Sequence, residues 1–384
     1  MFNVKLEKYL KGDPIIWFIV ILLSVLSIFV VYSATGTLAY RHMAGNTEYY
    51  LMKHTLLVGL SFFAMWGAHK IDYRYYSRIS RLFLWRSVPL LIFTWKFGTT
   101  INEATRWLTI PIINQVFQPS DLAKLALITN LAAMLSKRQQ HIENLKETLI
   151  PILLWSGLIC GLIALTDFSS ATLLLVTSLL ILFIGRVPVK YLAMLIVVGV
   201  LAGALAFSIG QRGETVISRI QEFLDPTEIP FQAKQSYIAI ATGGITGKGP
   251  GKSDQRNFLP HPYSDFIYAI IIEEYGITGG IVVVLLYLGL LWRGILTASR
   301  SDRAFGGLLS AGLSFALVMQ AMINMGVAVG LGPITGLPLP LVSMGGTSLL
   351  FTGLALGIIL SVSRGETNET ESRHNELKNM QHAA

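Results

Sequence analysis

The chain has 384 residues and a formal net charge of +8, with 53% hydrophobic and only 14% charged residues. Because soluble domains carry about 25% charged residues, this composition and a mean hydropathy of +0.58 exclude an ordinary soluble protein and indicate an integral membrane protein. The single cysteine, Cys160, excludes an intramolecular disulfide and argues against thiolate metal sites.

The chain begins with a polar, basic segment, residues 1–13, followed by an apolar run from Ile15 to Val31. That run is longer than the roughly 7 to 15 apolar residues of a secretory signal. We therefore expect residues 1–13 to be a cytoplasmic N-terminus that precedes a retained first span. SATGTLA resembles a cleavage site, but the length of the run makes cleavage the weaker alternative.

Apolar runs close to the ~20 residues that cross a bilayer recur along the chain. The predicted fold is all-α, with a single polytopic membrane domain at residues 14–363 and no visible internal repeat. We expect about ten transmembrane helices, at residues 14–33, 51–68, 79–97, 120–136, 148–165, 168–186, 189–208, 266–292, 304–331 and 343–363.

Basic residues occupy alternate connections between the predicted spans. The connections on one side of the membrane contain few basic residues, chiefly Arg41 and Arg106. The connections and terminal segments on the other side contain most of the basic residues: Lys5, Lys8, Lys11, Lys70, Arg74, Arg78, Lys137, Arg138, Lys146, Arg186, Lys190, Arg293, Arg300, Arg303, Arg364, Arg373 and Lys378. By the positive-inside rule, both termini are expected in the cytoplasm. Because these charges are dispersed over many loops, a nucleic-acid partner is not expected.

Several segments are too long or too irregular to be plain connections. Gly98 to Pro119 mixes apolar residues with Trp107 and suggests a surface-lying or re-entrant piece. Residues 209–265 are expected to form a large extracytoplasmic loop between the seventh and eighth spans, and their aromatic and aliphatic content argues against disorder. Asn324 to Ser348 has too many glycines and prolines for one helix, so it must pack inside protein or line a wet cavity. The polar segment 364–384 is expected to be a disordered cytoplasmic tail.

Three acids lie close together in NFLPHPYSDFIYAIIIEEYG, Asn257 to Gly276. An ionised side chain at the bilayer centre costs on the order of 2.5 to 3.5 kcal/mol on insertion scales, so each acid needs a compensating role. Asp265 has two interpretations: a helix cap, which Ser264 could supply instead, or a general base at the membrane boundary. Glu273 and Glu274 are expected about 12 to 14 Å deeper, in a buried ion pair or a polar helix contact.

Two further acids also have both structural and functional interpretations. Asp121 and Lys124 stand three residues apart and share a helix face, either as an intrahelical pair or as site residues. Ser120 or Asp121 is also a candidate cap for that helix. Asp167 is a candidate cap for the helix that follows it.

A glycine-rich stretch, Gly243 to Ser253, has the sequence GGITGKGPGKS. It is not a Walker A motif, because Thr246 stands where glycine is required. Its backbone N–H groups, with Lys248 and Lys252, can nevertheless bind a diphosphate, or the stretch can be a flexible connector. His261 lies between two prolines and is expected to be a turn residue.

Taken together, these motifs resemble the SEDS proteins (shape, elongation, division and sporulation), the FtsW/RodA group of bacterial cell-wall polymerases. The resemblance covers nearly the whole chain. Its motifs are RWLTI (Arg106 to Ile110), FQPSDLAKLA (Phe117 to Ala126), FLDP (Phe223 to Pro226), QSYIAIATGGITGKGPGKS (Gln235 to Ser253) and the stretches Asn257 to Gly276 and Asn324 to Ser348. FLDP and GKGPGKS favour the division branch over the elongation branch.

The resemblance implies a glycosyltransferase that polymerises lipid II, a disaccharide-peptide on undecaprenyl diphosphate, at the outer face of the bacterial cytoplasmic membrane. The essential aspartate of the family matches Asp265, the expected base for the acceptor hydroxyl. Substrate contacts are expected from Arg106, Trp107, Lys124, Arg212, Arg219, Lys248, Lys252 and Ser264, with Mg²⁺ or Mn²⁺ as a further candidate for neutralising the diphosphate. Residues expected to shape the cavity are Asp121, Asp167, Glu273, Glu274 and Asn324. The implied partners are a class B penicillin-binding transpeptidase and other divisome or elongasome membrane proteins.

The chain departs from the family pattern at a few positions. Asp121 replaces a more common Glu, Met344 replaces a common aromatic residue, and Thr166 and Ser169 replace Pro and Gly. Two rival functions stay open. A flippase or transporter of lipid-linked saccharides also uses intramembrane acids and broken helices, but it needs ionisable groups at mid-depth and inverted repeats. A non-catalytic scaffold of the wall-synthesis complex would tolerate replacement of Asp265.

Overall fold

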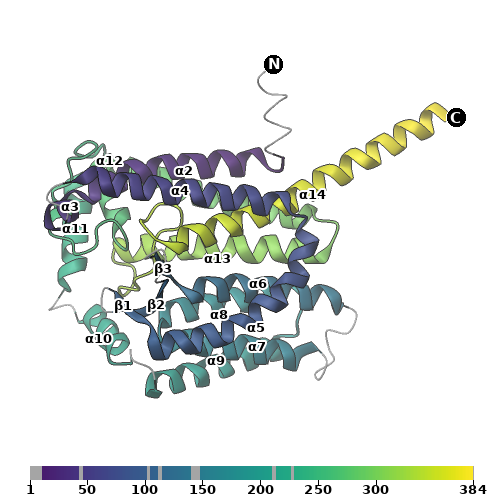
Figure 1. Ribbon diagram of the computed structural model, residues 1–384, viewed down its shortest axis with the longest axis horizontal. Helices are drawn as coiled ribbons and strands as arrows, with labels where there is room; N and C mark the ends of the chain where they lie inside the picture. Colours follow the sequence, from purple (N-terminus) through teal and green to yellow (C-terminus); the bar gives the residue numbers. More distant parts are fainter. Residues whose placement is uncertain are drawn as a thin grey trace.

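The computed structural model describes residues 11–42, 46–101, 104–110, 115–139, 148–209, 213–225 and 229–383. Long helices run side by side in a bundle, and a small sheet and several short helices gather at one end of it (Figure 1). We call this the sheet end. The opposite end, where the first bundle helix begins and the last one leaves the bundle, is the terminal end.

Each of the predicted spans coincides with a helix. The bundle helices are α2 (Pro14–Ala34), α4 (Thr47–Lys70), α5 (Tyr73–Phe97), α6 (Pro119–Lys137), α7 (Ile150–Ala164), α8 (Phe168–Ile184), α9 (Val189–Ile209), α12 (Ile267–Arg300), α13 (Ala304–Ala328) and α14 (Thr347–Ala383). The shorter helices are α3 (Gly36–His42), α10 (Gly213–Leu224), α11 (Phe231–Gly243) and the 3-10 helix η3 (Gln255–Asn257).

Among the described residues, six helices are long and apolar enough to cross a membrane: α2, α4, α9, α12, α13 and the first half of α14. Helices α7 and α8 are apolar but shorter. The chain is therefore a mostly helical, multi-pass membrane protein. The number of crossings stays a prediction.

The segment expected to be surface-lying or re-entrant, Gly98 to Pro119, contains a small sheet. Its strands are β1 (Thr99–Ile101), β2 (Ala104–Ile110) and β3 (Gln115–Phe117), paired antiparallel in the order β1-β2-β3. Their β-branched and aromatic residues favour a pleated backbone, a signal that the sequence interpretation did not use. The sheet holds Arg106 and Trp107 at the sheet end of the bundle.

The tail also differs from expectation. Residues 364–383, expected to be disordered, continue α14 as a helix to Ala383. The physical reason lies in composition, because this segment has no proline and contains four glutamates and two arginines, which tolerate helical backbone well.

Small residues let the helices pack closely. Gly353 and Gly357 of α14 lie directly against the backbone of α4, where an added Cβ would overlap the carbonyl groups of Ser61 and Met65. Such close approach is the usual device for packing helices in a membrane, where dispersion contacts replace the hydrophobic effect as the driving force. Helix α14 is thereby held in place against α4, and it packs beside the segment that precedes it, residues 329–346.

Helix α12 changes direction at Gly276. This glycine has φ +73°, so the helical segments 267–275 and 277–300 do not share one straight axis. The glycine-rich loop packs into the bend: the N–H groups of Lys248 and Gly249 donate to the carbonyls of Glu273 and Glu274, each at 2.9 Å. An added Cβ at Gly276 would overlap the loop backbone at residue 245.

Replacing Gly276 tests this bend. Gly276→Ala forces a left-handed conformation on a residue with a side chain, which costs about 1 to 3 kcal/mol, and its Cβ also overlaps the loop. We expect a lower midpoint in thermal unfolding of the detergent-solubilised protein. The control is Gly59→Ala, an exposed helical glycine with open space at its Cβ position, which we expect to be neutral or stabilising by up to about 1 kcal/mol. Equal midpoints for the two variants would contradict the role of Gly276.

Candidate active site

The site is built around an irregular segment between α13 and α14, residues 329–346. Its glycines and prolines predict such a break, and the structure confirms it. Side chains from elements distant in sequence donate to the carbonyl groups of residues 334–342. The donors are Arg219 of α10, Arg106 of β2, Asn324 and Gln320 of α13, Tyr287 of α12 and Ser27 of α2. Irregular backbone inside the bundle is thereby satisfied.

Asp265 lies beside this segment, directly before α12. Its side chain is half-buried, and Ser264 Oγ donates to its Oδ1 at 2.9 Å. Asn324 Nδ2 donates to the Asp265 carbonyl at 2.8 Å and to the Leu337 carbonyl at 2.7 Å, which fixes the backbone of Asp265 against the irregular segment. Among the described residues, no ion pair includes the Asp265 carboxylate.

The alternative of a helix cap at Asp265 is wrong. Helix α12 has Phe266 at the N-cap position and no side-chain hydrogen bond to its first turn. The Asp265 carboxylate, which a cap would have committed to backbone N–H groups, is therefore left for another partner.

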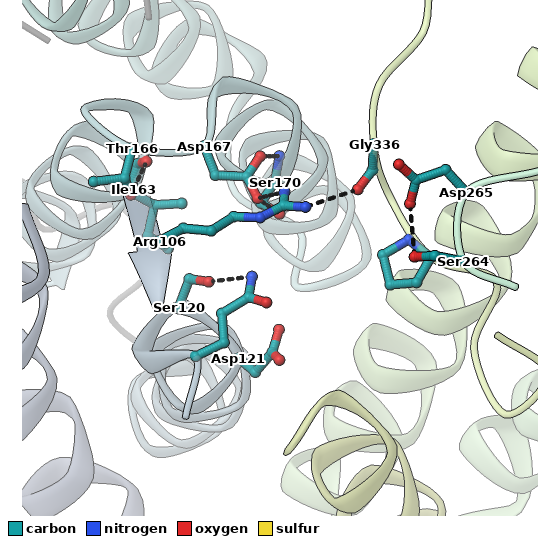
Figure 2. A network of polar contacts seen from close by, with 12 residues as sticks. Arg106, Ser120, Asp121, Ile163, Thr166, Asp167, Ser170, Ser264, Asp265 and Gly336 are labelled. Carbon is teal, nitrogen blue, oxygen red and sulfur yellow. Dashed lines mark hydrogen bonds and ion pairs between the residues drawn. The ribbon is translucent and has the colours of Figure 1, made fainter. Parts of the chain in front are cut away.

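Arg106 reaches the same place from β2. Its Nη1 donates to Asp167 Oδ2 at 2.9 Å and its Nη2 to the Gly336 carbonyl at 3.2 Å. The guanidinium also lies 4.7 Å from the centre of the Trp107 ring. Figure 2 shows Arg106 extended between Asp167 on one side and Gly336 on the other. The cation is thereby held in one orientation.

Asp167 has the predicted capping role and an ion pair that the sequence did not indicate. Its Oδ1 accepts from the Ser170 N–H at 3.0 Å, at the start of α8. Burial by itself raises the pKa of Asp167, but the Arg106 charge and the hydrogen bonds from Ser170 outweigh it and hold that pKa below its ordinary value. Asp167 is therefore ionised at neutral pH and serves to orient Arg106.

Gly336 separates the carboxylate from the cation. A Cβ added there would lie 3.6 Å from Asp265 Oδ2 and 3.9 Å from Arg106 Nη2, and the glycine has φ +67°. Figure 2 shows Asp265 on one side of Gly336 and Arg106 on the other. One open position thus faces both a free carboxylate and a guanidinium.

A cavity of about 160 Å³ opens at this position. We call it the active-site cavity. Its polar lining includes Arg106, Trp107, Gln118, Asp121, Lys124, Asp167, Ser170, Tyr263, Ser264, Gln320, Thr347 and Ser348. A smaller, mainly apolar cavity of about 70 Å³ shares Asp121, Lys124, Gln320 and Ser348 with it and extends between α6, α8, α13 and α14.

Asp121 and Lys124 form the predicted intrahelical pair at this cavity. Lys124 Nζ lies 2.8 Å from Asp121 Oδ1, and both side chains are largely buried. Helix α6 begins at Pro119 with Gln118 at the N-cap position and no side-chain cap, so the capping interpretation of Ser120 and Asp121 is wrong.

Some polar atoms of the cavity residues are buried but unpaired. Among the described residues, Arg106 Nε, Asp121 Oδ2 and Asn324 Oδ1 have no hydrogen-bond partner. Each such atom costs about 1 to 3 kcal/mol unless a ligand or water satisfies it. Since these atoms belong to residues that line or support the cavity, the arrangement fits a polar ligand.

An apolar groove of about 350 Å³ lies next to the active-site cavity. It is lined by residues of α8, α10, α13 and the irregular segment, and Leu337 borders both spaces. Its single basic side chain, Arg219, is tied to the Ile334 carbonyl at 3.0 Å. A cavity with polar side chains next to an apolar groove suits a ligand that carries both polar and apolar groups.

Other predicted site residues lie elsewhere. Lys248 and Lys252 are on the glycine-rich loop and do not line the active-site cavity, and Lys252 is exposed. Their expected role in binding the diphosphate therefore has no geometric basis here, because Lys248 is occupied by Glu273 and Asp254 at 2.7 and 2.9 Å. Arg212 lies outside the described residues.

Glu273 and Glu274 hold the glycine-rich loop rather than shaping the active-site cavity. The fully buried Glu273 accepts from Lys248, from Ser253 Oγ and from the N–H groups of residues 254 and 255. Glu274 accepts from Ser33 Oγ and from the Ser253 N–H. The hydrogen bond to Glu273, followed by that to Asp254, raises the pKa of Lys248, which keeps the loop cation charged.

The expected depth of these acids is also wrong. Glu274 contacts Ser33, close to the sheet end of α2. Ser27 lies about 9 Å from Ser33 along α2, on the side away from the sheet end. Ser27 Oγ donates to the Val342 carbonyl, and the next residue, Ser343, donates to the carbonyl of Ser264, the neighbour of Asp265. Asp265 is thus further from the sheet end than the two glutamates. The prediction assumed that residues 267–275 run inward from Asp265, whereas they run toward the sheet end and the helix changes direction only afterwards, at Gly276.

A divalent cation gains no support from protein ligands. The described part of the chain contains no group of three or more His, Cys, Asp or Glu side chains that could hold a metal ion. In the active-site cavity, Asp121 and Asp167 are already paired with cations. A protein-only cage therefore does not fit.

Gly336, Gln320 and Tyr263 are site residues that the sequence interpretation did not name individually. Gly336 and Tyr263 lay within motifs that were recognised only as whole stretches. Gln320 could have been predicted from the sequence, because a polar amide inside an otherwise apolar membrane helix needs a hydrogen-bond partner.

Comparison with known proteins identifies the family. The family model described as "Cell cycle protein", covering FtsW, RodA and SpoVE, matches residues 13–368. The chain belongs to the FtsW/RodA/SpoVE family. This membership confirms the resemblance inferred from the motifs.

Relatives of the family align along most of the chain. The "Probable peptidoglycan glycosyltransferase FtsW" of Geobacter sp. (strain M18) is 33% identical over 357 residues, covering 91% of this chain and 96% of the relative. "Stage V sporulation protein E" of Bacillus subtilis (strain 168) is 32% identical over 364 residues, covering 93% and 98%.

Solved structures show the same fold. Rod shape determining protein RodA of Thermus thermophilus matches with a TM-score of 0.68 and 26% identity, covering 93% of this chain and 98% of RodA. A chain from a structure described as "Structural coordination of polymerization and crosslinking by a peptidoglycan synthase complex" matches with a TM-score of 0.71 and 26% identity, covering 92% and 98%.

Replacing Glu273 tests its structural role. Glu273→Ala removes the acceptor of Ser253 Oγ and of the N–H groups of residues 254 and 255, and it leaves Lys248 with Asp254 alone. Each buried group that loses its acceptor costs about 1 to 3 kcal/mol. We expect a lower unfolding midpoint and faster proteolysis within the loop. The control is Asp254→Ala, which removes an exposed partner of the same lysine and should have only a small effect. Equal effects of the two variants would contradict this role.

Proposed function

We propose that this chain is a peptidoglycan glycosyltransferase that polymerises lipid II at the outer face of the bacterial cytoplasmic membrane. The observation that carries the proposal is the Asp265 carboxylate, free of any ion pair among the described residues, which lies with Arg106 around Gly336. Arg106, Gly336 and Ser264, the neighbour of Asp265, line the active-site cavity. Family membership and relatives named as peptidoglycan glycosyltransferases support it.

Asp265 acts as the general base. It takes the proton of the acceptor hydroxyl as the hydroxyl oxygen attacks the anomeric carbon of the second saccharide. A C–O bond forms at that carbon while the bond to the diphosphate breaks, and the diphosphate leaves with the electron pair. Asn324 holds the Asp265 backbone in place for this step.

Arg106 and Lys124 stabilise the departing diphosphate. Both line the active-site cavity, and each is oriented by a buried aspartate, Asp167 and Asp121 respectively. A cation held in advance where negative charge develops stabilises the transition state without reorganisation. The apolar groove behind Leu337 is suited to the isoprenoid chain of the substrate.

The membrane orientation follows from charge. Described basic residues gather at the terminal end, where α4 ends at Lys70, α6 ends at Lys137 and α13 begins after Arg303. By the positive-inside rule the terminal end faces the cytoplasm, together with both termini, and the active-site cavity faces outward. The large loop, residues 209–265, is then extracytoplasmic and carries α10 and α11.

Cross-linking of the new strand requires a partner enzyme. The peptidoglycan synthase complex that contains a chain of the same fold is described as coordinating polymerization and crosslinking. A class B penicillin-binding transpeptidase is accordingly the partner we infer, within a divisome or elongasome. FtsW relatives of 33% identity favour the division role.

Polymerisation by purified protein tests the proposal. With labelled lipid II, we expect glycan strands from the wild type and a loss of about 10²- to 10⁴-fold in rate from Asp265→Ala and Asp265→Asn. Unfolding midpoints should stay unchanged, because the carboxylate caps no helix. The readout is gel separation of the labelled strands.

The matched control is Asp254→Asn, an exposed aspartate of the same large loop that does not line the active-site cavity. It should polymerise as the wild type does. Equal polymer from all the variants would end the base assignment. Absence of polymer from every protein, even with the cognate transpeptidase, would favour a flippase or a scaffold.

A further inference from the structure

A second cavity borders the active-site cavity. It has a volume of about 260 Å³ and lies between the start of α3 and the loop 256–263. We call it the His261 pocket. Tyr263 lines both cavities, so one aromatic side chain forms a shared wall between them.

The lining of the His261 pocket is mainly apolar, and a few hydrogen-bonding side chains are set into it. His261 Nδ1 lies 3.3 Å from Tyr263 Oη, and the two rings meet edge to face at 6.0 Å. Thr37 Oγ1 donates to Asn257 Oδ1 at 2.6 Å, which orients the Asn257 amide so that its nitrogen is a donor. Arg256, the basic lining residue, donates from Nη1 to Ser33 Oγ at 3.0 Å and to the Ser33 carbonyl at 3.1 Å.

This set of groups suits a saccharide. Hydroxyl and acetamido groups need both donors and acceptors, which imidazole, phenol and amide side chains provide. The Tyr263 ring adds an apolar face with a polar tip. None of the residues that line the pocket is acidic, so an anionic substituent on the sugar meets no repulsion there.

Size supplies an independent argument. Glycosyl transfer joins two saccharides, and both must be present when the bond forms. The active-site cavity, at about 160 Å³, is below the roughly 300 to 1,000 Å³ of pockets that enclose a small-molecule ligand. It is therefore too small to enclose two disaccharides.

We infer that the His261 pocket is a second saccharide subsite. One substrate lies against Asp265 and Arg106, and the sugar chain of the other extends past Tyr263 into the His261 pocket. The reaction itself is unchanged: the acceptor hydroxyl loses its proton to Asp265 and displaces the diphosphate. The inference rests on the proposed polymerase function and names where its second substrate is held.

The kinetic test compares variants of one loop. His261→Ala removes a hydrogen-bonding group, and we expect the KM for lipid II to rise about tenfold with kcat nearly unchanged. His261→Trp fills the pocket and should also shorten the strands. The control is Phe258→Ala, an exposed residue of the same loop that lines neither cavity. An unchanged KM in both His261 variants would overturn the inference.

A binding test does not depend on activity. The probe is the lipid-free disaccharide-peptide, and saturation-transfer NMR on the detergent-solubilised full chain reports its contact with the protein. We expect the signal to fall at least by about half in His261→Trp and to persist in Asp265→Asn and Phe258→Ala. Equal signals in all proteins would overturn the subsite, whereas a wild type that binds the probe but makes no polymer would contradict the polymerase function alone.

Discussion

The structure depends on satisfying backbone carbonyls that have no helical partner inside a membrane bundle. Residues 329–346 leave helical geometry between α13 and α14, and an unpaired carbonyl there costs several kcal/mol in the absence of water. Side chains from α2, α10, α12, α13 and β2 supply the missing donors. Elements distant in sequence are thereby fixed to one segment.

The donors that stabilise this segment also place the chemical groups. Arg106 satisfies the Gly336 carbonyl and in doing so is directed toward Asp265. Asn324 satisfies the Leu337 carbonyl and holds the Asp265 backbone with the same amide. Site geometry and fold stability are therefore properties of one hydrogen-bond network, in which each member supports the others.

The sequence predicted the helices and the broken segment well, because both depend on local composition. Runs of apolar residues gave the bundle helices, and the glycines and prolines of residues 324–348 gave the irregular segment. Pairings between distant residues could not be predicted in this way. The ion pair of Arg106 with Asp167, and the bond of Glu274 to Ser33, depend on how the chain returns on itself. A local count of residues also misplaced Glu273 and Glu274, because it could not show that residues 267–275 run toward the sheet end before the helix bends at Gly276.

The distribution of charge explains why one acid among several is suited to proton transfer. Asp121, Asp167 and Glu273 are buried, and each is paired with a cation: Lys124, Arg106 and Lys248. The guanidinium beside Asp167 favours the ionised carboxylate and holds the pKa of Asp167 below its ordinary value. Asp265 is half-buried, receives one hydrogen bond from its neighbour Ser264 and has no cation partner among the described residues. The paired acids fix the cations and the loop. Glu274, which also has no ion pair among the described residues, is buried against Ser33 and the loop, so Asp265 is the carboxylate beside the active-site cavity that is left to accept a proton.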